Sequence, residues 1–302
     1  MLEISELRKR FSGGAGAPGG KLALDGISFT VRPGEMYGFV GANGAGKTTT
    51  MRIVMGVLQA DSGTVSWQGR PLGYDARQRF GYMPEERGLY QKMRVGQQIE
   101  YFGRLHGLSA TAAKKATDDL LERLGLTERR NDPVQALSLG NQQRVQLAVA
   151  LVHDPEVLIL DEPFSGLDPI AVDALATALQ ERCRSGVPVI FSSHQLELVE
   201  RLCDSVGIVS GGRMVATGTV EELRAAEGGT LVVVVRDPAP GWADGIPGTV
   251  TVDGDRHILR TSDVRTSEDG QEILRRAMKA GVVERFGAEH PSLTEIFKEA
   301  VA

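Results

Sequence analysis

Gly41-Ala42-Asn43-Gly44-Ala45-Gly46-Lys47-Thr48 is the stretch that decides the fold of this 302-residue chain. It fits the spacing G-x-x-x-x-G-K-[ST], and it lies between the apolar run of residues 36–40 and a segment compatible with a helix. Glycines let consecutive backbone N–H groups turn toward phosphate oxygens, and the positive end of the following helix dipole faces the same anion. The alternative, a glycine-rich surface turn, does not require this context. The stretch therefore predicts a phosphate-binding loop between a strand and a helix.

The last two residues of the stretch have separate roles in such a loop. The Lys47 ammonium reaches the β and γ phosphates of a nucleotide, where it stabilises the charge that develops during phosphoryl transfer. The Thr48 hydroxyl can ligate Mg²⁺, so we expect the loop to bind a nucleotide together with Mg²⁺. The other nucleotide contacts predicted here are Gly41, Asn43, Gly44, Ala45, Gly46 and the adjoining Thr49.

Composition restricts the class of protein. A formal net charge of -5 argues against a protein that neutralises the phosphates of DNA or RNA, so we expect no nucleic-acid partner. Apolar runs stay far below the roughly 18 to 20 residues that cross a bilayer, and the acidic N-terminus is unlike a secretory signal. Any membrane role is therefore expected to come through a partner. Cys183 and Cys203 occur singly, which favours buried, inert thiols over a metal or redox site.

The chain up to about residue 220 alternates apolar runs with helical patterns, which predicts an α/β domain with a mixed sheet core. Its start favours an antiparallel β part, with a Gly/Pro-rich loop at residues 12–20. Residues 88–137 have helical spacing and no strand run, so we expect an inserted helical subdomain there. The predicted strands of this domain are residues 2–7, 27–31, 36–40, 157–160, 187–192, 206–210 and 213–216.

Composition shifts near residues 228–229, and a small α+β module is predicted beyond that point. A helix pattern at residues 271–280 accompanies strand patterns at 231–235, 249–252, 257–259 and 282–286. The final helix begins with a capping box from Ser292 to Glu295. Its apolar face, which favours core or interface, is formed by Leu293, Ile296, Phe297, Ala300 and Val301. We therefore expect two domains, residues 1–227 and 228–302.

Four further segments follow the phosphate-binding loop along the chain. They are Leu137-Ser138-Leu139-Gly140-Asn141-Gln142-Gln143-Arg144, Val157-Leu158-Ile159-Leu160-Asp161-Glu162, Ser165-Gly166-Leu167-Asp168, and His194 after the apolar run 187–191. With them, residues 1–225 resemble the ATP-binding subunits of ABC transporters, which are P-loop ATPases. In that family the loop is the Walker A motif. The other segments resemble, in order, the LSGGQ signature, the Walker B strand, the D-loop and the switch histidine.

The resemblance implies a role for each matched residue. Glu162 orients or deprotonates the water that attacks the γ phosphate, His194 contacts that phosphate, and Asp161 lies near Mg²⁺. Lys47, Glu162 and His194 are thus the predicted catalytic residues. The signature and D-loop residues act on ATP held by a second subunit, which implies a dimer that closes on two Mg-ATP. These residues are Ser138, Gly140, Asn141 and Asp168.

Two more positions resemble family features. Phe11 resembles the aromatic residue that stacks on adenine, the alternative being a plain apolar strand residue. Glu85 stands where most relatives carry a glutamine, and because its carboxylate can also bind Mg²⁺, we expect it among the metal ligands with Thr48 and Asp161. Residues 84–90 and 291–297 resemble a subgroup linked to sodium or drug efflux, which suggests an exporter.

These observations predict an ATP-hydrolysing subunit that drives separate membrane permease subunits at the cytoplasmic face of the cell membrane. One alternative is a soluble ABC-type ATPase of translation or DNA repair. It is disfavoured because the chain has one compact cassette, no long heptad insertion and two cysteines. A second alternative is a regulatory subunit without catalysis, which the presence of both Lys47 and Glu162 disfavours.

Overall fold

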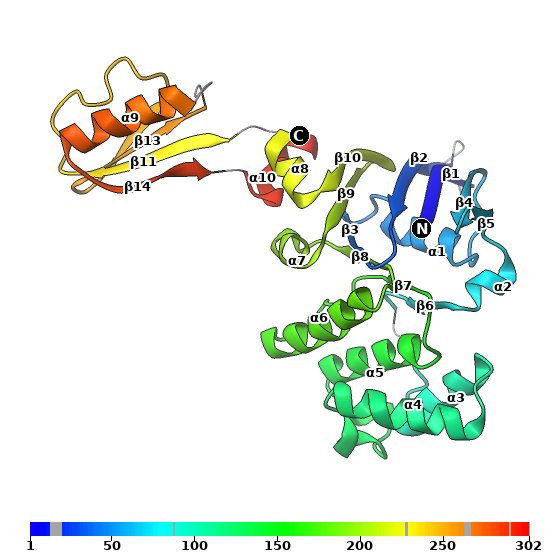
Figure 1. The fold of residues 1–302 in the computed structure, drawn as a ribbon. Helices are drawn as coiled ribbons and strands as arrows, with labels where there is room; N and C mark the ends of the chain where they lie inside the picture. The colour runs from blue at the N-terminus through cyan, green and yellow to red at the C-terminus, as the bar shows by residue number, and fades with distance from the viewer. Residues whose placement is uncertain (13–19, 87, 227–228, 263–266, 290, 302) are drawn as a thin grey trace. The chain divides into compact units, whose positions relative to one another are not determined.

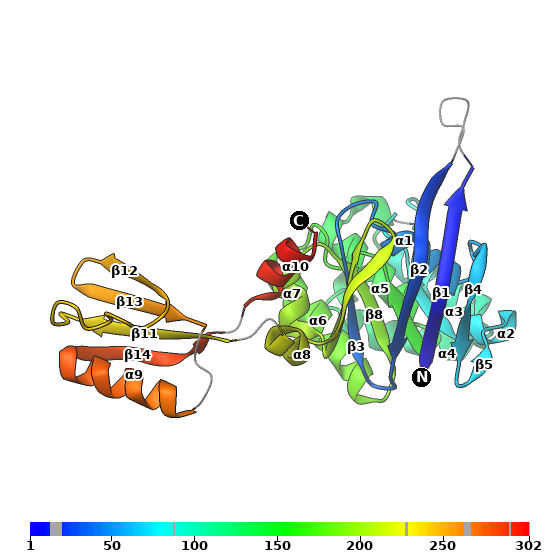
Figure 2. The same ribbon diagram turned by 90° about the horizontal axis from the view of Figure 1, so that it is seen from above.

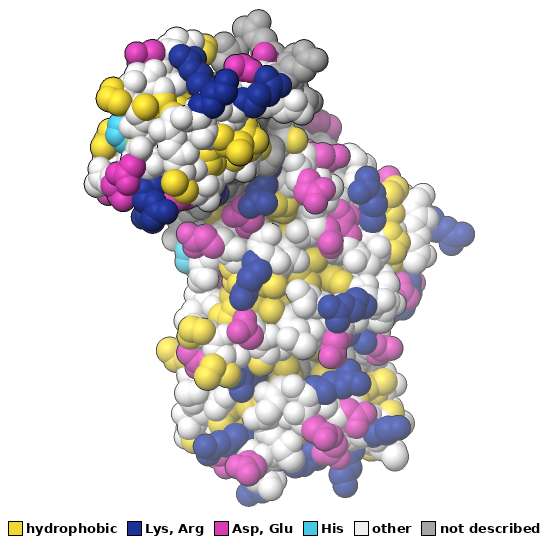
Figure 3. Space-filling model, turned by 60° about the vertical axis from the view of Figure 1, so that its left-hand side comes forward, with side chains coloured by type: hydrophobic (Ala, Val, Ile, Leu, Met, Phe, Trp, Pro, Cys, Tyr) yellow, Lys and Arg dark blue, Asp and Glu magenta, His cyan; other side chains and the backbone are white. Residues whose placement is uncertain are grey.

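The computed structural model of the chain describes residues 1–12, 20–86, 88–226, 229–262, 267–289 and 291–301. The chain divides into two compact units, residues 1–220 and 221–300, which Figure 1 draws in one ribbon. Acidic and basic side chains are interspersed on the face of each unit that Figure 3 shows. No helix in the described ranges is both long enough and apolar enough to cross a membrane.

The first unit begins with an antiparallel sheet of strand order β2-β1-β4-β5. Its strands are β1 (Leu2–Phe11), β2 (Lys21–Val31), β4 (Ser62–Trp67) and β5 (Arg70–Pro71). The predicted antiparallel β part is therefore confirmed, although β1 and β2 are longer than the apolar runs that indicated them. Of the predicted loop at residues 12–20, positions 13–19 lie outside the described residues.

The second sheet of this unit contains the phosphate-binding loop and has the order β10-β9-β3-β8-β7-β6. All neighbouring pairs are parallel except β9 with β10. Strands β3 and β7 are buried at every position, which explains why their sequences are apolar throughout rather than alternating. The strands are β3 (Met36–Val40), β6 (Phe80–Met83), β7 (Val157–Leu160), β8 (Val189–Ser193), β9 (Ser205–Ser210) and β10 (Arg213–Thr219).

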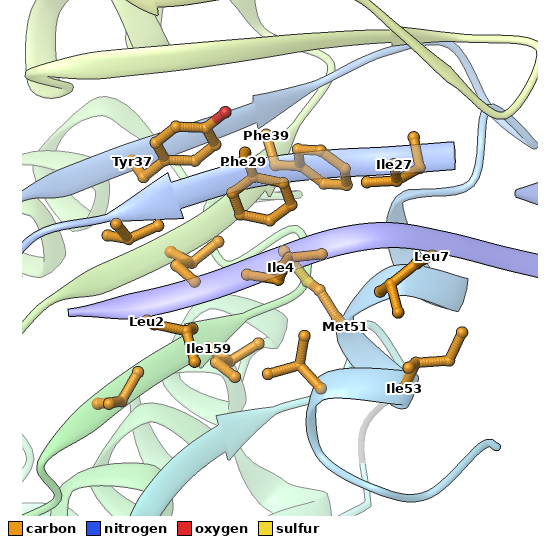
Figure 4. Packing of buried hydrophobic residues seen from close by; sticks show 14 of the residues in the cluster. Leu2, Ile4, Leu7, Ile27, Phe29, Tyr37, Phe39, Met51, Ile53 and Ile159 are labelled. Carbon is orange, nitrogen blue, oxygen red and sulfur yellow. The ribbon is translucent and has the colours of Figure 1, made fainter. Parts of the chain in front are cut away.

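A hydrophobic core lies between the two sheets and the helix that follows the loop (Figure 4). Ile4 and Leu7 of β1 face Met51 of α1 (Lys47–Val54), and the Phe29 ring stacks on Tyr37 at 4.9 Å between ring centroids. This core fixes the loop because it holds both the strand before the loop and the helix after it.

The predicted helical segment contains α3 (Val95–Leu105), α4 (Ala110–Arg123) and two short 3₁₀ turns, Thr127–Arg129 and Val134–Ala136. They pack with α5 (Leu139–Leu151), as Figure 1 shows. The other helices of the unit are α2 (Tyr74–Arg77), α6 (Pro169–Arg184) and α7 (Leu196–Leu202), followed by α8 (Val220–Ala226) at its boundary. Cys183 and Cys203 are buried and free, as predicted, and burial raises the pKa of the Cys183 thiol to about 12.

The second unit contains an antiparallel sheet of order β12-β13-β11-β14, and helix α9 (Ser267–Ala280) lies along this sheet (Figures 1 and 2). Its separate core includes Val233, Trp242, Leu259 and Ala277. The capping box of α10 is present, since Ser292 N donates to Glu295 Oε2 at 2.8 Å. Leu293 and Ile296 are buried, whereas the side chains of Ala300 and Val301 lie outside the described residues. The elements are β11 (Thr230–Arg236), β12 (Thr249–Asp253), β13 (Arg256–Thr261), α9 (Ser267–Ala280), β14 (Val282–Glu289) and α10 (Leu293–Val301).

Candidate active site

Three adjacent parallel strands, β3, β8 and β7, bring the predicted catalytic segments to one edge of the sheet. Strand β3 leads into the phosphate-binding loop, β7 into Asp161 and Glu162, and β8 into His194. Ligand groups gather at the carboxyl ends of parallel strands. The sheet order therefore assembles one site from three distant parts of the chain.

The phosphate-binding loop requires glycine at two positions, Gly46 and Gly41. Gly46 has φ 116°, and a Cβ there would lie 2.9 Å from the Ala23 carbonyl oxygen. A Cβ on Gly41 would lie 2.4 Å from the Val209 carbonyl oxygen. No side chain caps the start of α1, so its first N–H groups remain available to an anion.

Lys47 is buried in this loop beside a carboxylate. Its Nζ donates to the Gly41 carbonyl oxygen at 2.6 Å and lies 3.7 Å from Glu162 Oε1. A buried ammonium is stable only when it is paired and hydrogen-bonded. The loop and Glu162 together meet that requirement and keep the cation at the cavity.

Asp161 is fully buried behind the loop and is bound by a serine that carries no motif. Ser192 Oγ donates to Asp161 Oδ1 at 2.6 Å and accepts from Glu162 N at 2.8 Å. Asp161 Oδ2 has no hydrogen-bond partner among the described residues. A buried carboxylate oxygen without a partner is costly, so this atom is suited to bind a ligand that enters the site.

Glu162 connects the loop to His194. Its Oε2 lies 2.9 Å from His194 Nδ1, and its side chain is about nine-tenths buried while that of His194 is half exposed. The backbone of Glu162 has φ 51°, which is strained for a residue with a Cβ. Ser192 Oγ holds its N–H, and Gln143 of α5 donates to the next carbonyl, that of Pro163, at 2.9 Å. These bonds hold the carboxylate in a conformation that an isolated turn would not keep.

A cavity of about 410 Å³ opens in front of these groups. Phe11, Glu85 and Glu162 line it together with residues of the loop. The segment of Glu85 is held because Gln146 of α5 donates to the Pro84 carbonyl oxygen at 2.6 Å. The full lining is Phe11, Lys21, Ala23, Ala42, Asn43, Gly44, Gly46, Lys47, Thr48, Thr49, Glu85 and Glu162.

The structure thus places most predicted contacts together and adds others that the sequence reasoning missed. Gly41 and Ala45 lie in the loop without lining the cavity, and Asp161 and His194 adjoin it through the contacts above. Lys21, Ala23, Ala42 and Ser192 were not predicted as site residues. Ser192 could have been found from strand pairing, because Leu160 lies opposite Phe191 and the next residues must be neighbours.

The signature and D-loop residues do not line this cavity. Ser138 caps α5 by accepting from Asn141 N at 3.4 Å, and Asp168 caps α6 by accepting from Ala171 N at 2.8 Å. A Cβ on Gly140 would lie 3.5 Å from Leu167 Cδ2, so the two segments are neighbours on the surface. They form a second, separate group of predicted contact residues.

This fold and site define a P-loop nucleotide-hydrolysing protein, and comparison with known proteins specifies the family. A model described as "ABC transporter" matches residues 24–165, and one described as "ATP-binding protein DrrA1-3-like, C-terminal domain" matches residues 218–301. An uncharacterized ABC transporter ATP-binding protein, YhaQ of Bacillus subtilis, is 39% identical over 305 residues that cover 100% of this chain and 98% of that protein. The chain therefore belongs to the ATP-binding subunits of ABC transporters, and it is an ATPase.

Other relatives extend the comparison. The daunorubicin resistance ATP-binding protein DrrA3 of Streptomyces coeruleorubidus is 35% identical over 92% of this chain and 91% of its own length. A solved ATP-binding subunit of an ABC transporter is 32% identical, with a TM-score of 0.66 over 75% of this chain and 93% of that one. A dimeric bacterial ABC transporter cassette, 20% identical, has a TM-score of 0.67 over 72% of this chain and 98% of its own, which shows the fold alone. The predicted fold class and family are confirmed.

Proposed function

We propose that this chain is the ATP-hydrolysing subunit of an exporter, and that Lys47, Glu162 and His194 are its catalytic residues. One observation carries the proposal. The Glu162 carboxylate lies 3.7 Å from the Lys47 ammonium through one oxygen and 2.9 Å from the His194 ring through the other. A water held against Glu162 would thus lie at the γ-phosphate end of a nucleotide bound in the loop, with a cation and an imidazole beside it.

Mg²⁺ is proposed as the second cofactor, bound by Thr48 and Asp161 with Glu85 nearby. The unpartnered, buried Asp161 Oδ2 and the position of Thr48 in the cavity lining support this fit. The described residues hold no group of three or more His, Cys, Asp or Glu side chains arranged for a metal. That sparse donor set suits Mg²⁺, which keeps several waters and binds through one or two carboxylates plus phosphate oxygens. When bound, the ion neutralises phosphate charge.

A second copy of the chain is the proposed partner at the signature and D-loop. Ser138 and Asp168 are exposed and lie outside the cavity of their own chain, which supports a role on the nucleotide of another subunit. Separate permease subunits would hold the dimer at the inner face of the membrane. The names of similar proteins, such as the daunorubicin resistance protein, support export as the direction.

We further propose that residues 1–227 form the cassette and 228–302 an accessory domain, a division that the two separate cores support.

Substitution of Glu162 by Gln tests the catalytic assignment. We expect the variant to bind ATP with near-normal affinity while phosphate release falls at least about 100-fold, because general-base catalysis is lost. Glu122, exposed on α4, provides the control substitution Glu122→Gln, which should leave turnover unchanged. Turnover near the wild-type rate in Glu162→Gln would reject the assignment.

Purification from detergent-solubilised membranes tests the partners. We expect a polytopic membrane protein to co-purify with the chain in a complex that hydrolyses ATP. Recovery only with ribosomes or DNA, or alone in the soluble fraction, would instead favour a soluble ABC-type ATPase.

A further inference from the structure

Lys21 is a second lysine of the nucleotide cavity, outside every motif. It is the first residue of β2, it lies opposite Phe11 in the β1–β2 pair, and its side chain lines the cavity. Because β1 and β2 are hydrogen-bonded neighbours in the sheet, the two side chains project from a common platform beside the loop.

The Lys21 ammonium reaches the phosphate-binding loop from this platform. A Cβ built on Gly44, in the middle of the loop, would lie 3.6 Å from Lys21 Nζ. Lys47 Nζ is bonded instead to the carbonyl of Gly41, the first residue of the loop, and lies beside Glu162. The two ammonium groups therefore approach the loop at different points.

Nothing in the described parts of the chain pairs with this cation, as neither a hydrogen bond nor an ion pair involves Lys21 Nζ. The other lysine near Phe11 differs, because Lys9 Nζ bonds Asp61 Oδ1 at 2.8 Å. An ammonium beside loop N–H groups that already favour an anion adds to the positive potential there. Its natural partner is the anion that the loop binds.

We propose that Lys21 binds the α and β phosphates of the bound nucleotide. This inference rests on the proposed nucleotide site. The assignment to these phosphates follows from position, since Lys21 lies between Phe11, the predicted adenine contact, and Gly44. The γ phosphate is expected at Lys47 and Glu162. Lys21 thus contributes to affinity for ADP and ATP alike and not to the hydrolytic step.

Substitution of Lys21 by Met tests the proposal in the full-length chain, because Met keeps the length of the stem and removes the charge. We expect the Kd for ADP and the Kd for ATP both to rise about fivefold, as for loss of one exposed charge-assisted contact. Lys21→Arg retains the charge and should bind within about twofold of wild type. Raising the salt concentration should weaken wild-type binding more than Lys21→Met binding.

Two controls separate the possible failures. Lys115→Met changes an exposed lysine of α4 and should leave both affinities unchanged. Lys47→Ala tests the site itself. If Lys47→Ala weakens binding but Lys21→Met does not, or if Lys21→Met affects ATP and not ADP, the role of Lys21 is rejected while the site stands. If Lys47→Ala leaves ADP and ATP affinity unchanged, the proposed nucleotide site is wrong and the inference fails with it.

Discussion

At the scale of single residues, Ser192 determines how the two carboxylates of the site are held. Its hydroxyl is the hydrogen-bond donor to Asp161 and the acceptor for the Glu162 N–H. Replacement by Ala leaves both groups buried without these partners. We expect the free energy of unfolding to fall by about 2 kcal/mol and ATP turnover to fall about tenfold. Urea unfolding and phosphate release measure the two effects.

The next residue provides the comparison. Ser193 is equally buried, but its hydroxyl accepts from Gln195 N and contacts neither carboxylate. Ser193→Ala should cost about 1 kcal/mol of stability and change turnover little. Equal loss of turnover in both variants would show that Ser192 does not act through the carboxylates.

Gly46 is the second residue considered, and its identity is fixed by the local backbone geometry. Ala at this position combines an unfavourable φ with a Cβ 2.9 Å from a backbone oxygen. We therefore expect Gly46→Ala to lower the free energy of unfolding by about 3 kcal/mol and to weaken nucleotide binding as well. Gly69 also has positive φ, but no atom lies within 4 Å of its added Cβ. Gly69→Ala should therefore cost only about 1 kcal/mol, and an equal cost for both would contradict the close contact at Gly46.

At the scale of elements, two histidine rings join the helical segment to the sheet. His106, at the end of α3, stacks on His153, which follows α5, with ring centroids 3.7 Å apart. Both rings bond backbone carbonyls near the start of β6, those of Gln78 and Phe80. The helices are thus fixed to the strand that leads to Glu85.

This contact predicts a loss of stability in acid. Burial, reinforced by His106, lowers the pKa of His153 from 6.5 to about 4. Between these values the unfolded chain binds a proton that the folded chain does not, so stability falls as pH falls from about 6.5 to 4. Between pH 7 and pH 4.5 this difference in proton binding lowers the free energy of unfolding by about 2 kcal/mol. Urea unfolding at pH 7 and pH 4.5 should show a smaller pH dependence for His153→Gln than for wild type, and equal dependence would contradict it.

The strands of the phosphate-binding sheet that were predicted from the sequence are mainly those whose burial gives a recognisable run of apolar residues. Strands β3 and β7 are fully buried and therefore apolar throughout, so their patterns were evident. Strand β4 is mostly exposed and reads Ser-Gly-Thr-Val-Ser-Trp, which shows no alternation, and it was not predicted. The order of strands could not be predicted either, because β3 pairs with β8 far along the chain.

The same distinction applies to the site. Gly41 to Thr48, Asp161 and Glu162 stand in motifs whose spacing reflects local geometry, so they were predicted. Lys21 and Ser192 reach the site only through strand pairing, across β1–β2 and β7–β8. Such residues become visible when the register of the sheet is known.

At the scale of the whole molecule, each unit has a hydrophobic core of its own. Val233 is fully buried in the core of the second unit. We expect Val233→Ala to lower the stability of that unit by about 2 kcal/mol and to leave the Kd for ATP unchanged, because no residue of the nucleotide cavity belongs to that core. Calorimetric unfolding and ATP titration test this. A weakened ATP affinity would show that the two units are energetically coupled.

The two cores also give the protein a built-in pair of optical reporters. The chain has two tryptophans, and one lies in each core, Trp67 in the first and Trp242 in the second. Trp67→Phe therefore leaves a fluorophore that senses only the second unit, and Trp242→Phe leaves one that senses only the first. Melting curves of these two variants would assign each unfolding step to its own half of the chain without any added label.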